Sequence, residues 1–240
     1  KTVPVNGRTP RPCDDLQICA APRVCRFNDT KGELRILCYG DSLTAGANFE
    51  GRKFTPYAWT LAESLLAKDV RADVSVCGLN GLTASQMVQK MAWSTVHDVH
   101  GYVGQGLLSI LHHTLFDLVL IMAGTNDIAH GQICQAIFDN VSELHRACHA
   151  IGVPTIALAP SSPKARSREQ VANLLHLWSE STPKVLAFHD PERDCLPRVD
   201  QTLWEPDCLH FSPTGSARLG TFMAQEIFRL FELSDKPELE

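Results

Sequence analysis

The chain has 240 residues, of which 44% are hydrophobic and 20% charged, and its formal net charge is −5. A negative net charge argues against a nucleic-acid-binding protein, because such proteins usually carry a basic excess or a basic patch. No apolar run approaches the ~18–20 residues that a membrane-spanning helix needs, and the longest run, Leu118–Ala123, has the length of a buried strand. We therefore expect a soluble globular protein.

Residues 1–33 differ from the rest of the chain, because they are rich in Pro, Arg, Asp and Cys and show no hydrophobic period. We divide the chain accordingly into an irregular, Cys-containing N-terminal arm, 1–33, and a folded domain, 34–240. The evenly spaced Cys13, Cys19 and Cys25 lack the Cys-x-x-Cys spacing of a strong zinc site. A disulfide and metal binding both remain open for them.

The compartment is only weakly indicated. The chain begins with Lys1 rather than Met, so we expect a processed chain; secretion and an organelle are both open, and the compartment is left unassigned. Asn-x-Ser/Thr sequons at Asn28 and Asn140 favour secretion, although the second falls within an expected helix. Cys38 and Cys77 lie inside apolar runs and are expected to be buried thiols.

Short apolar runs alternate with segments of helical period after the arm. The strand candidates, each bounded by polar or Gly residues, are 34–39, 73–77, 117–123, 153–158 and 185–188. The helix candidates between and after them are 58–66, 84–92, 106–115, 133–148, 167–180 and 219–230. Ser212 as N-cap and Pro213 at the first helical position are a good start signal for the last helix. Strands that alternate with helices indicate a parallel sheet covered on both faces.

A Gly-containing loop with polar side chains follows each of the first three strands. These loops are Gly40–Gly46, Gly78–Thr83 and Gly124–Asp127. In an open parallel sheet, ligands bind beyond the carboxyl ends of the strands, where the strand order reverses. In a flavodoxin-like order, 2-1-3-4-5, the three loops would be neighbours at that point.

The residues of these loops suit nucleophilic ester hydrolysis, which needs a nucleophile, a base, a group that orients the base, and donors to the oxyanion. Ser42 supplies a hydroxyl at a tight turn. The N–H groups of Ser42 and Gly81 and the side-chain amide of Asn126 are the candidate oxyanion donors. Asp207 precedes His210 by three residues, a spacing that allows the carboxylate to hold one ring nitrogen while the other faces Ser42.

These motifs resemble those of the SGNH hydrolase superfamily, also called GDSL esterases and lipases. Gly-Asp-Ser-Leu at 40–43 is similar to its first block, Gly81 to the second-block glycine, Gly124-Thr125-Asn126-Asp127 to the third block, and Asp207-x-x-His210 to the fifth. The resemblance covers about residues 34–232. It implies a three-layer α/β/α fold with a parallel five-stranded sheet in the order 2-1-3-4-5, a Ser42–His210–Asp207 triad, and an oxyanion hole formed by Ser42, Gly81 and Asn126.

Two positions depart from the family pattern. Cys208 stands between the Asp and His where many relatives have Gly, which narrows the site but removes no catalytic group. Asn80 stands where relatives often have Ser, so this loop is expected to be anchored differently. The arm, 1–33, is not explained by the family.

Structural interpretations compete with the catalytic ones. Ser42 could be only a helix N-cap, Gly81 only a turn glycine, and Asn126 only a turn residue, but their occurrence together favours catalysis. For Asp127 we favour a structural role, as the N-cap of the following helix.

Two other patterns in the sequence could suggest further sites. The histidines His97, His100, His112 and His113 lack ligand-like neighbours, so we predict surface positions rather than a metal site. Ser161-Ser162-Pro163-Lys164 matches Ser-x-x-Lys, which we interpret as chance because its partner motifs are missing.

The sequence therefore predicts a serine esterase that acts on small-molecule carboxylic esters through an acyl-enzyme, without cofactor or metal. An acyltransferase with a non-water acceptor, or a non-catalytic binding protein of the same fold, remains an alternative. The segment 82–116 is expected either to line the acyl-binding rim or to pack the helices. Short loops favour small or short-to-medium acyl groups. The natural ester and the oligomeric state are left open.

Overall fold

Five parallel strands form the central sheet in the computed structural model, which describes residues 33–234. In chain order they are β1 (Leu34–Gly40), β2 (Ala72–Gly78), β5 (Leu118–Met122), β6 (Thr155–Leu158) and β7 (Val185–His189). Their spatial order, β2-β1-β5-β6-β7, is the 2-1-3-4-5 order of the prediction, which is thereby confirmed. The expectations for the arm, including those for Cys13, Cys19, Cys25 and Asn28, lie outside the described residues.

The middle of the sheet is buried on both faces. In β1, Ile36 and Cys38 point into one core, whereas Leu37 and Tyr39 point into the other. Each of these four side chains is at most 1% exposed. A strand with two buried faces needs a continuous apolar run rather than an alternating one, and this is why the sequence of β1 is almost wholly apolar.

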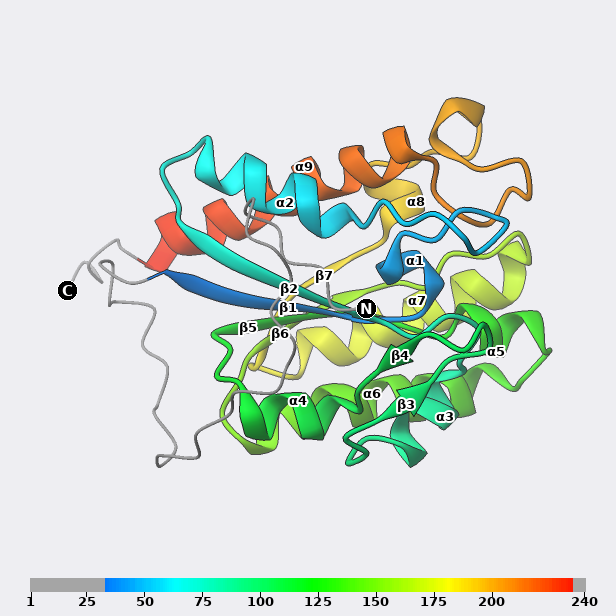
Figure 1. Cartoon of the computed structure of the whole chain (residues 1–240), viewed down its shortest axis with the longest axis horizontal. Coiled ribbons are helices and arrows are strands. Elements are labelled where there is room, and N and C mark those ends of the chain that lie inside the picture. Colours follow the sequence, from blue (N-terminus) through cyan, green and yellow to red (C-terminus); the bar gives the residue numbers. More distant parts are fainter. Residues whose placement is uncertain (1–32, 235–240) are drawn as a thin grey trace.

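Helices cover both faces of the sheet, as Figure 1 shows. One layer consists of α2 (Tyr57–Leu66) and α9 (Pro213–Ser234). The other layer consists of α3 (Ala84–Gln89), α4 (Leu107–His113), α6 (Cys134–Ala150) and α7 (Ala165–Glu180). Gly220 allows α9 to pack closely on α2, because a Cβ there would lie 2.3 Å from the carbonyl oxygen of Tyr57. The fold is thus the three-layer α/β/α arrangement that the sequence predicts.

Short helices lie beyond the carboxyl ends of the strands. They are α1 (Ser42–Ala45), α5 (Thr125–Ala129), α8 (Pro191–Asp194) and a 3-10 helix, η1 (Gln201–Leu203). Each of α1, α5 and α8 begins within a few residues of a strand end, so that its polar side chains are held at one edge of the sheet. This edge is where the predicted site residues meet.

A small antiparallel hairpin, β3 (Val96–His97) and β4 (Val103–Gly104), was not predicted from the sequence. It lies within the segment 82–116, which we expect either to line the acyl-binding rim or to pack the helices. Met87, Met91 and Val96 belong to the core beneath the hairpin, so the packing interpretation holds for them. Tyr102, in contrast, lines a cavity at the sheet edge.

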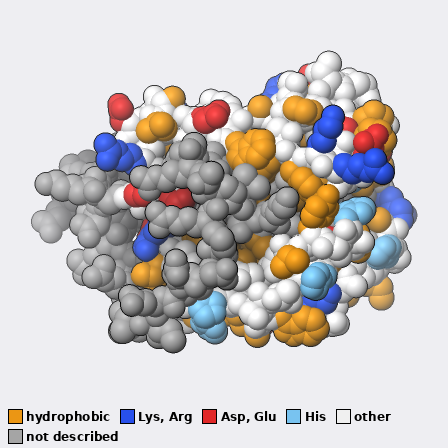
Figure 2. All heavy atoms as spheres, viewed as in Figure 1, with side chains coloured by type: hydrophobic (Ala, Val, Ile, Leu, Met, Phe, Trp, Pro, Cys, Tyr) orange, Lys and Arg blue, Asp and Glu red, His pale blue; other side chains and the backbone are white. Residues whose placement is uncertain are grey.

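The described surface mixes residue types, and in Figure 2 hydrophobic side chains lie between charged ones of both signs on the face shown. No helix among the described residues is both long and apolar enough to cross a membrane. Cys38 and Cys77 are buried thiols, as expected.

Candidate active site

The proposed nucleophile, Ser42, is the first residue of α1 and lies directly beyond the end of β1. The N-cap of this helix is Asp41, whose Oδ1 accepts a hydrogen bond from the N–H of Leu43 at 3.0 Å. The interpretation of Ser42 as an N-cap is therefore wrong. Because Asp41 performs the capping, the hydroxyl of Ser42 is available for another partner.

That partner is His210. The Nε2 of His210 lies 2.9 Å from the Oγ of Ser42, and its Nδ1 lies 2.6 Å from the Oδ2 of Asp207. The other oxygen of Asp207 accepts the backbone N–H groups of Leu209 and His210 at 2.9 and 3.0 Å. The structure thus brings three predicted residues into one hydrogen-bonded chain, although Ser42 lies 165 or more positions before Asp207 and His210 in the sequence.

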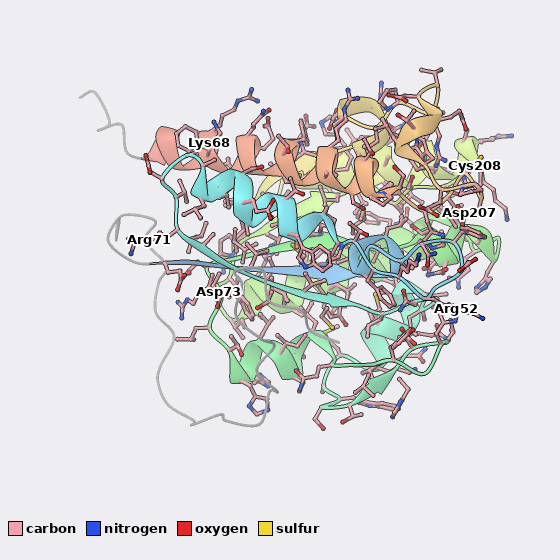
Figure 3. The ribbon with its side chains drawn as sticks, turned by 45° about the horizontal axis from the view of Figure 1, so that its top comes forward. Arg52, Lys68, Arg71, Asp73, Asp207 and Cys208 are labelled. Atoms are coloured by element: carbon pink, nitrogen blue, oxygen red, sulfur yellow. The ribbon has the colours of Figure 1, made fainter. Side chains whose placement is uncertain are left out.

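The turn that carries Asp207 lies at the carboxyl edge of the sheet. Figure 3 shows Asp207 and Cys208 at the opposite end of the molecule from Lys68 and Arg71, the latter preceding β2. Burial alone raises the pKa of Asp207, but hydrogen bonds from the ring of His210 and from two backbone N–H groups outweigh it. The pKa of this carboxyl therefore lies below its ordinary value, and Asp207 is an ionised acceptor at neutral pH.

Gly81 occupies a position that only glycine tolerates. Its φ is +72°, in the left-handed region, and a Cβ would lie 2.4 Å from the Cγ2 of Val99. Among the described residues, no acceptor takes the N–H of Gly81 or that of Ser42. Both N–H groups are therefore open to a ligand at the sheet edge.

Asn126 lies beside this loop. Its side-chain amide donates a hydrogen bond to the carbonyl of Leu82 at 2.9 Å. A primary amide has two N–H groups, so this bond leaves one of them for a substrate oxygen. The contact places Asn126 one residue from Gly81, and the structure thus groups all three predicted oxyanion donors around the ends of β2, β1 and β5.

Asp127 has a structural role, but not as the N-cap that the sequence suggested. It lies inside α5, and its Oδ2 accepts the N–H of Ala84, the first residue of α3, at 2.7 Å. The carboxylate thus stabilises the N-terminus of a different helix, where negative charge is favourable. Burial raises the pKa of Asp127, although the hydrogen bond from Ala84 counteracts this effect.

Sequence reasoning missed Asp98, which anchors the second loop. This buried carboxylate accepts the backbone N–H and the side-chain amide of Asn80 at 3.3 and 2.5 Å. Its other oxygen accepts the N–H groups of His100 and Tyr102, each at 2.9 Å. The unusual Asn80 was the available signal, since an Asn in place of Ser needs a different partner, but nothing in the sequence identified that partner.

Asp41, next to the proposed nucleophile, is fully buried. Burial raises its pKa to about 6, although the hydrogen bond from the N–H of Leu43 and the charge of His210 act in the opposite direction. Its carboxyl is thus harder to ionise than that of Asp207. The two acids of the site therefore have opposite shifts.

The Ser-x-x-Lys match is not a second site. Ser161 donates a hydrogen bond to Oε1 of Glu192 at 2.5 Å, whereas the Nζ of Lys164 donates to the carbonyls of Ile128 and Ala129 at 3.2 and 2.8 Å. The lysine thus stabilises the end of α5 and does not serve the serine. The interpretation as a chance match agrees with these contacts.

The four histidines that the sequence places on the surface, His97, His100, His112 and His113, are all exposed. The described part of the chain holds no group of three or more His, Cys, Asp or Glu residues arranged to hold a metal ion.

A small cavity of about 70 Å³ lies between α1 and the second loop. Its walls come from the helix of the proposed nucleophile, the loop before Gly81, the chain before α2 and the hairpin: Ala45, Phe54, Pro56, Val76, Gly78, Asn80 and Tyr102. The rings of Phe54 and Tyr102 meet edge to face, with centroids 5.1 Å apart. The cavity is thus mostly apolar and small.

Comparison with known proteins gave one family and many related folds. The model of the GDSL-like lipase/acylhydrolase family matches residues 38–218, a range that contains every candidate site residue. A search of curated proteins found no significant match.

Solved structures with the same fold are distant in sequence. A family 3 carbohydrate esterase of Clostridium thermocellum is 18% identical, with a TM-score of 0.65, over 85% of this chain and 100% of its own. The psychrotrophic esterase EstA of Pseudoalteromonas sp. is 16% identical, with a TM-score of 0.63, over 82% and 99%. A carbohydrate acetylesterase family member of Sinorhizobium meliloti is 19% identical, with a TM-score of 0.62, over 83% and 99%. At these identities the likeness concerns the fold alone.

Proposed function

We propose that this chain, which belongs to the GDSL-like lipase/acylhydrolase family, is a serine esterase that hydrolyses carboxylic esters through an acyl-enzyme on Ser42. The observation that carries the proposal is the continuous hydrogen-bonded chain from Ser42 through His210 to Asp207, with distances of 2.9 and 2.6 Å. A hydroxyl, an imidazole and a carboxylate in this order form the arrangement that activates a serine.

The hydrogen bond to the ionised carboxylate of Asp207 sets the tautomer of the base. An ionised carboxylate only accepts hydrogen bonds, so the proton of the neutral His210 ring lies on Nδ1, and Nε2 has a free lone pair. This lone pair faces the hydroxyl of Ser42 and can take its proton. Asp207 then stabilises the imidazolium that results.

In the acylation step, the Oγ of Ser42 bonds to the ester carbonyl carbon while its proton passes to Nε2 of His210. The carbonyl π-electrons move to the oxygen, and the tetrahedral oxyanion forms. When the electrons return, the bond to the alcohol oxygen breaks, and His210 gives its proton to the departing alcohol. Water then repeats these steps on the acyl-enzyme, with His210 again as base, and releases the carboxylic acid and Ser42.

Three donors are available for the oxyanion: the N–H groups of Ser42 and Gly81 and the second N–H of the Asn126 amide. They come from backbone or from a side chain that is already held at Leu82, so they need little reorganisation during the reaction.

The substrate class that the site supports best is an ester with a small or short-to-medium acyl group. The mostly apolar cavity beside Ala45 and Asn80 has a volume of only about 70 Å³. Related folds include a carbohydrate acetylesterase family member and an acetyl-xylooligosaccharide esterase. Together these observations favour acetyl and similarly short esters for this chain.

The first test is hydrolysis of p-nitrophenyl acetate, butyrate and octanoate by the wild type, Ser42→Ala and His210→Ala. Each variant should lower kcat by roughly 10³-fold or more, and Ser179→Ala, at a partly exposed serine of α7 outside the site, should leave it unchanged. A fluorophosphonate should also label the wild type, and peptide mass spectrometry should locate the label on Ser42. Equal turnover by the wild type and Ser42→Ala would contradict the proposal, and a steep preference for octanoate would contradict the short-acyl assignment.

We also propose that the catalytic unit lies within residues 34–240 and does not need the arm, 1–33. The family match begins at residue 38, and every proposed catalytic residue follows it. A variant that lacks residues 1–33 should retain turnover of p-nitrophenyl acetate. Loss of activity in a folded truncated variant would assign the arm a part in catalysis.

A further inference from the structure

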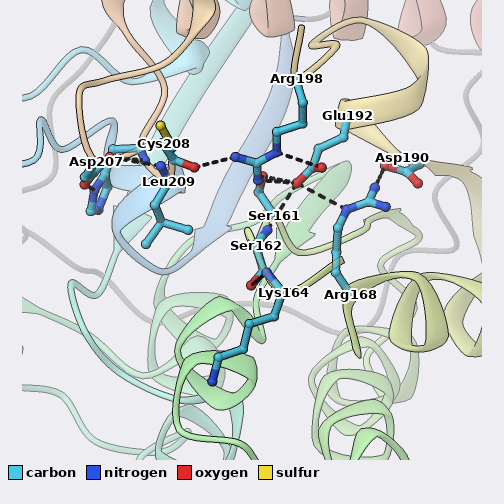
Figure 4. A network of polar contacts seen from close by, with 11 residues as sticks. Ser161, Ser162, Lys164, Arg168, Asp190, Glu192, Arg198, Asp207, Cys208 and Leu209 are labelled. Atoms are coloured by element: carbon cyan, nitrogen blue, oxygen red, sulfur yellow. Dashed lines mark hydrogen bonds and ion pairs between the residues drawn. The ribbon is translucent and has the colours of Figure 1, made fainter. Parts of the chain in front are cut away.

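A partly buried network of charged side chains lies behind the turn that carries Asp207 and His210. Figure 4 shows Arg198 between the carbonyl of Cys208 and the carboxylate of Glu192. Its Nη1 donates to that carbonyl, its Nε donates to Oε2 of Glu192 at 2.9 Å, and its Nη2 donates to Oε1 at 2.6 Å. The guanidinium carbon also lies 3.8 Å from the ring centroid of Trp204. Arg198 is thus fixed on three sides.

Glu192 is fixed in turn by neighbours from the sheet edge. Its Oε1 accepts the hydroxyl of Ser161 at 2.5 Å and the N–H of Ser162 at 3.1 Å, both just beyond β6. The Nε of Arg168 lies 3.2 Å from the same oxygen. Burial alone would raise the pKa of Glu192, but the hydrogen bonds from Arg198 and Ser161 and the two positive charges lower it. Glu192 is therefore ionised when it holds Arg198.

Arg168 closes the network on the far side. This arginine is only 4% exposed, and its Nη2 is paired with Oδ1 of Asp190, the N-cap of α8. Two guanidinium groups and two carboxylates thus balance in charge within the network. A balanced and hydrogen-bonded cluster of this kind is rigid, because removal of one member leaves its partner charged and buried.

The backbone of the turn, 205–210, is otherwise held by hydrogen bonds among its own residues, including those from Leu209 and His210 to Asp207. The turn closes through the N–H of Glu205 to the carbonyl of His210 at 2.8 Å and the N–H of Cys208 to the carbonyl of Glu205 at 2.9 Å. Cys208 has a φ of +54°, a left-handed conformation that is unfavourable for a residue with a side chain. Arg198 binds the carbonyl of this same residue, and so it stabilises the conformation that directs Asp207 and His210 toward Ser42.

We propose that Arg198 is a positioning residue: it holds the Asp207–His210 turn against the sheet edge through the carbonyl of Cys208, and Glu192 holds Arg198 in place. This inference rests on the proposed function, since positioning matters only if His210 serves Ser42. Arg198 touches neither Ser42 nor His210 through its side chain in any contact of the described structure. It acts on catalysis only through the turn.

Loss of Arg198 should therefore lower kcat more than it raises KM. A shift of the base by about 1 Å can cost roughly 10²-fold in rate. The cavity by Ala45 and Asn80, in contrast, has no lining residue on the turn, so substrate affinity there should change little. Arg198→Ala should lose roughly 10²-fold in kcat toward p-nitrophenyl acetate, with KM little changed. Arg146→Ala, at an exposed arginine paired with Glu143 on α6, is the matched control and should match the wild type.

Chemical rescue separates positioning from general damage. The truncated side chain leaves a site with Glu192, the carbonyl of Cys208 and the face of Trp204, all suited to a guanidinium ion. Non-denaturing concentrations of guanidinium or methylguanidinium chloride should restore part of the kcat of Arg198→Ala, and the same concentrations of sodium chloride should not. Arg198→Lys should remain impaired, because a single ammonium cannot reach the carbonyl of Cys208 and both oxygens of Glu192 together.

A proton NMR signal gives a second readout. The proton between Nδ1 of His210 and Asp207 should appear far downfield in the wild type and broaden or disappear in Arg198→Ala and Glu192→Gln as the turn loosens. Turnover within twofold of the wild type, with this signal intact in Arg198→Ala, would overturn the proposal. If circular dichroism shows that Arg198→Ala does not fold, the kcat and the NMR signal of Glu192→Gln test the proposal instead. A wild type that neither turns over ester nor reacts with a fluorophosphonate at Ser42 would instead remove the proposed function itself.

Discussion

The two halves of the candidate site are built in different ways. The half that contains Ser42, Gly81 and Asn126 sits at the ends of three neighbouring strands, and Ser42 is only 7% exposed. The half that contains Asp207 and His210 lies on a turn 18 residues beyond the end of β7, where the side chain of Asp207 is 30% exposed. Backbone pairing in the sheet positions the first half, and a side-chain network positions the second.

The two halves also differ in electrostatics. Burial raises the pKa of Asp41 to about 6, because water cannot solvate its carboxylate. The pKa of Asp207 is lowered, because hydrogen bonds from His210 and two backbone N–H groups overcome the effect of its burial. A carboxylate that must stay ionised for catalysis is thus placed where donors surround it, and the one that only caps a helix is placed in the core.

After Ser42→Ala, the largest effect on the strand-end half is expected for Asn126→Ala. Loss of one oxyanion donor should lower kcat by on the order of 10²–10³-fold with little change in stability. Asn140→Ala is a matched control, since the amide of Asn140 also donates to a backbone carbonyl, that of Ala136 at 2.8 Å, but on the exposed side of α6. Kinetics with p-nitrophenyl acetate decide the matter, and a loss below tenfold for Asn126→Ala would remove the oxyanion role.

Gly81→Ala tests whether backbone conformation controls this half. The new methyl group would collide with Val99 and the residue would keep a φ of +72°, so the loop should shift and kcat should fall by roughly 10²-fold. The double variant Gly81→Ala/Val99→Ala removes the collision but not the left-handed strain. It should therefore recover only part of the loss, and full recovery would show that the collision alone matters.

Asp98→Asn is expected to have a smaller effect on the same loop. Each oxygen of this carboxylate accepts two hydrogen bonds, so an amide nitrogen in place of either oxygen would face two donor groups, and both hydrogen bonds would be lost. If this change destabilises the active conformation of the loop by about 1.4 kcal/mol, kcat should fall roughly tenfold. Asp139→Asn, at an exposed carboxylate of α6 bonded only to Gln135, serves as the control. Unchanged kcat with reduced thermal stability would make Asp98 a purely structural residue.

The raised pKa of Asp41 predicts that the free energy of unfolding depends on pH. Asp41 has a folded pKa of about 6 against an ordinary 3.8, so the folded chain binds more protons than the unfolded one between these pH values. The free energy of unfolding contributed by Asp41 should therefore fall as pH rises from 4 to 6, by about 3 kcal/mol in total. Urea unfolding of the wild type and Asp41→Asn at pH 4, 5, 6 and 7 should show the variant gaining relative to the wild type as pH rises. A pH-independent difference would contradict the shift.

The comparison of the two halves also explains what the sequence could and could not predict. The strands were placed to within about two residues, because their apolar runs must fill two cores and so stand out in the sequence. Ser42, Gly81 and Asn126 follow those strands directly, and each was therefore found from local pattern. Asp207 and His210 were found only because their three-residue spacing is itself a motif.

The residues that hold these groups were not predictable in the same way. Asp98, Glu192 and Arg198 act through contacts between segments that lie far apart or in irregular chain, and no local pattern marks such partners. The hairpin of β3 and β4 was missed because strands of two residues have no period to detect. Asp127 was correctly given a structural role, but the helix that it stabilises follows from the tertiary fold alone.

The register of the sheet has a consequence for how this site can be varied. Gly40 is paired with Gly78 on one side and with Met122 on the other, so the three loops that bear the proposed oxyanion donors leave the sheet at the same level. Neighbouring strands repeat at about 4.8 Å, a distance set by main-chain geometry and not by the identity of any side chain. The chain between the first two loops, such as 47–55, can therefore be lengthened, shortened or exchanged for that of another enzyme while the frame keeps its dimensions, provided that Asp98, which anchors the second loop, is kept. Altered specificity in this scaffold should thus be reached by loop grafting sooner than by redesign of the core.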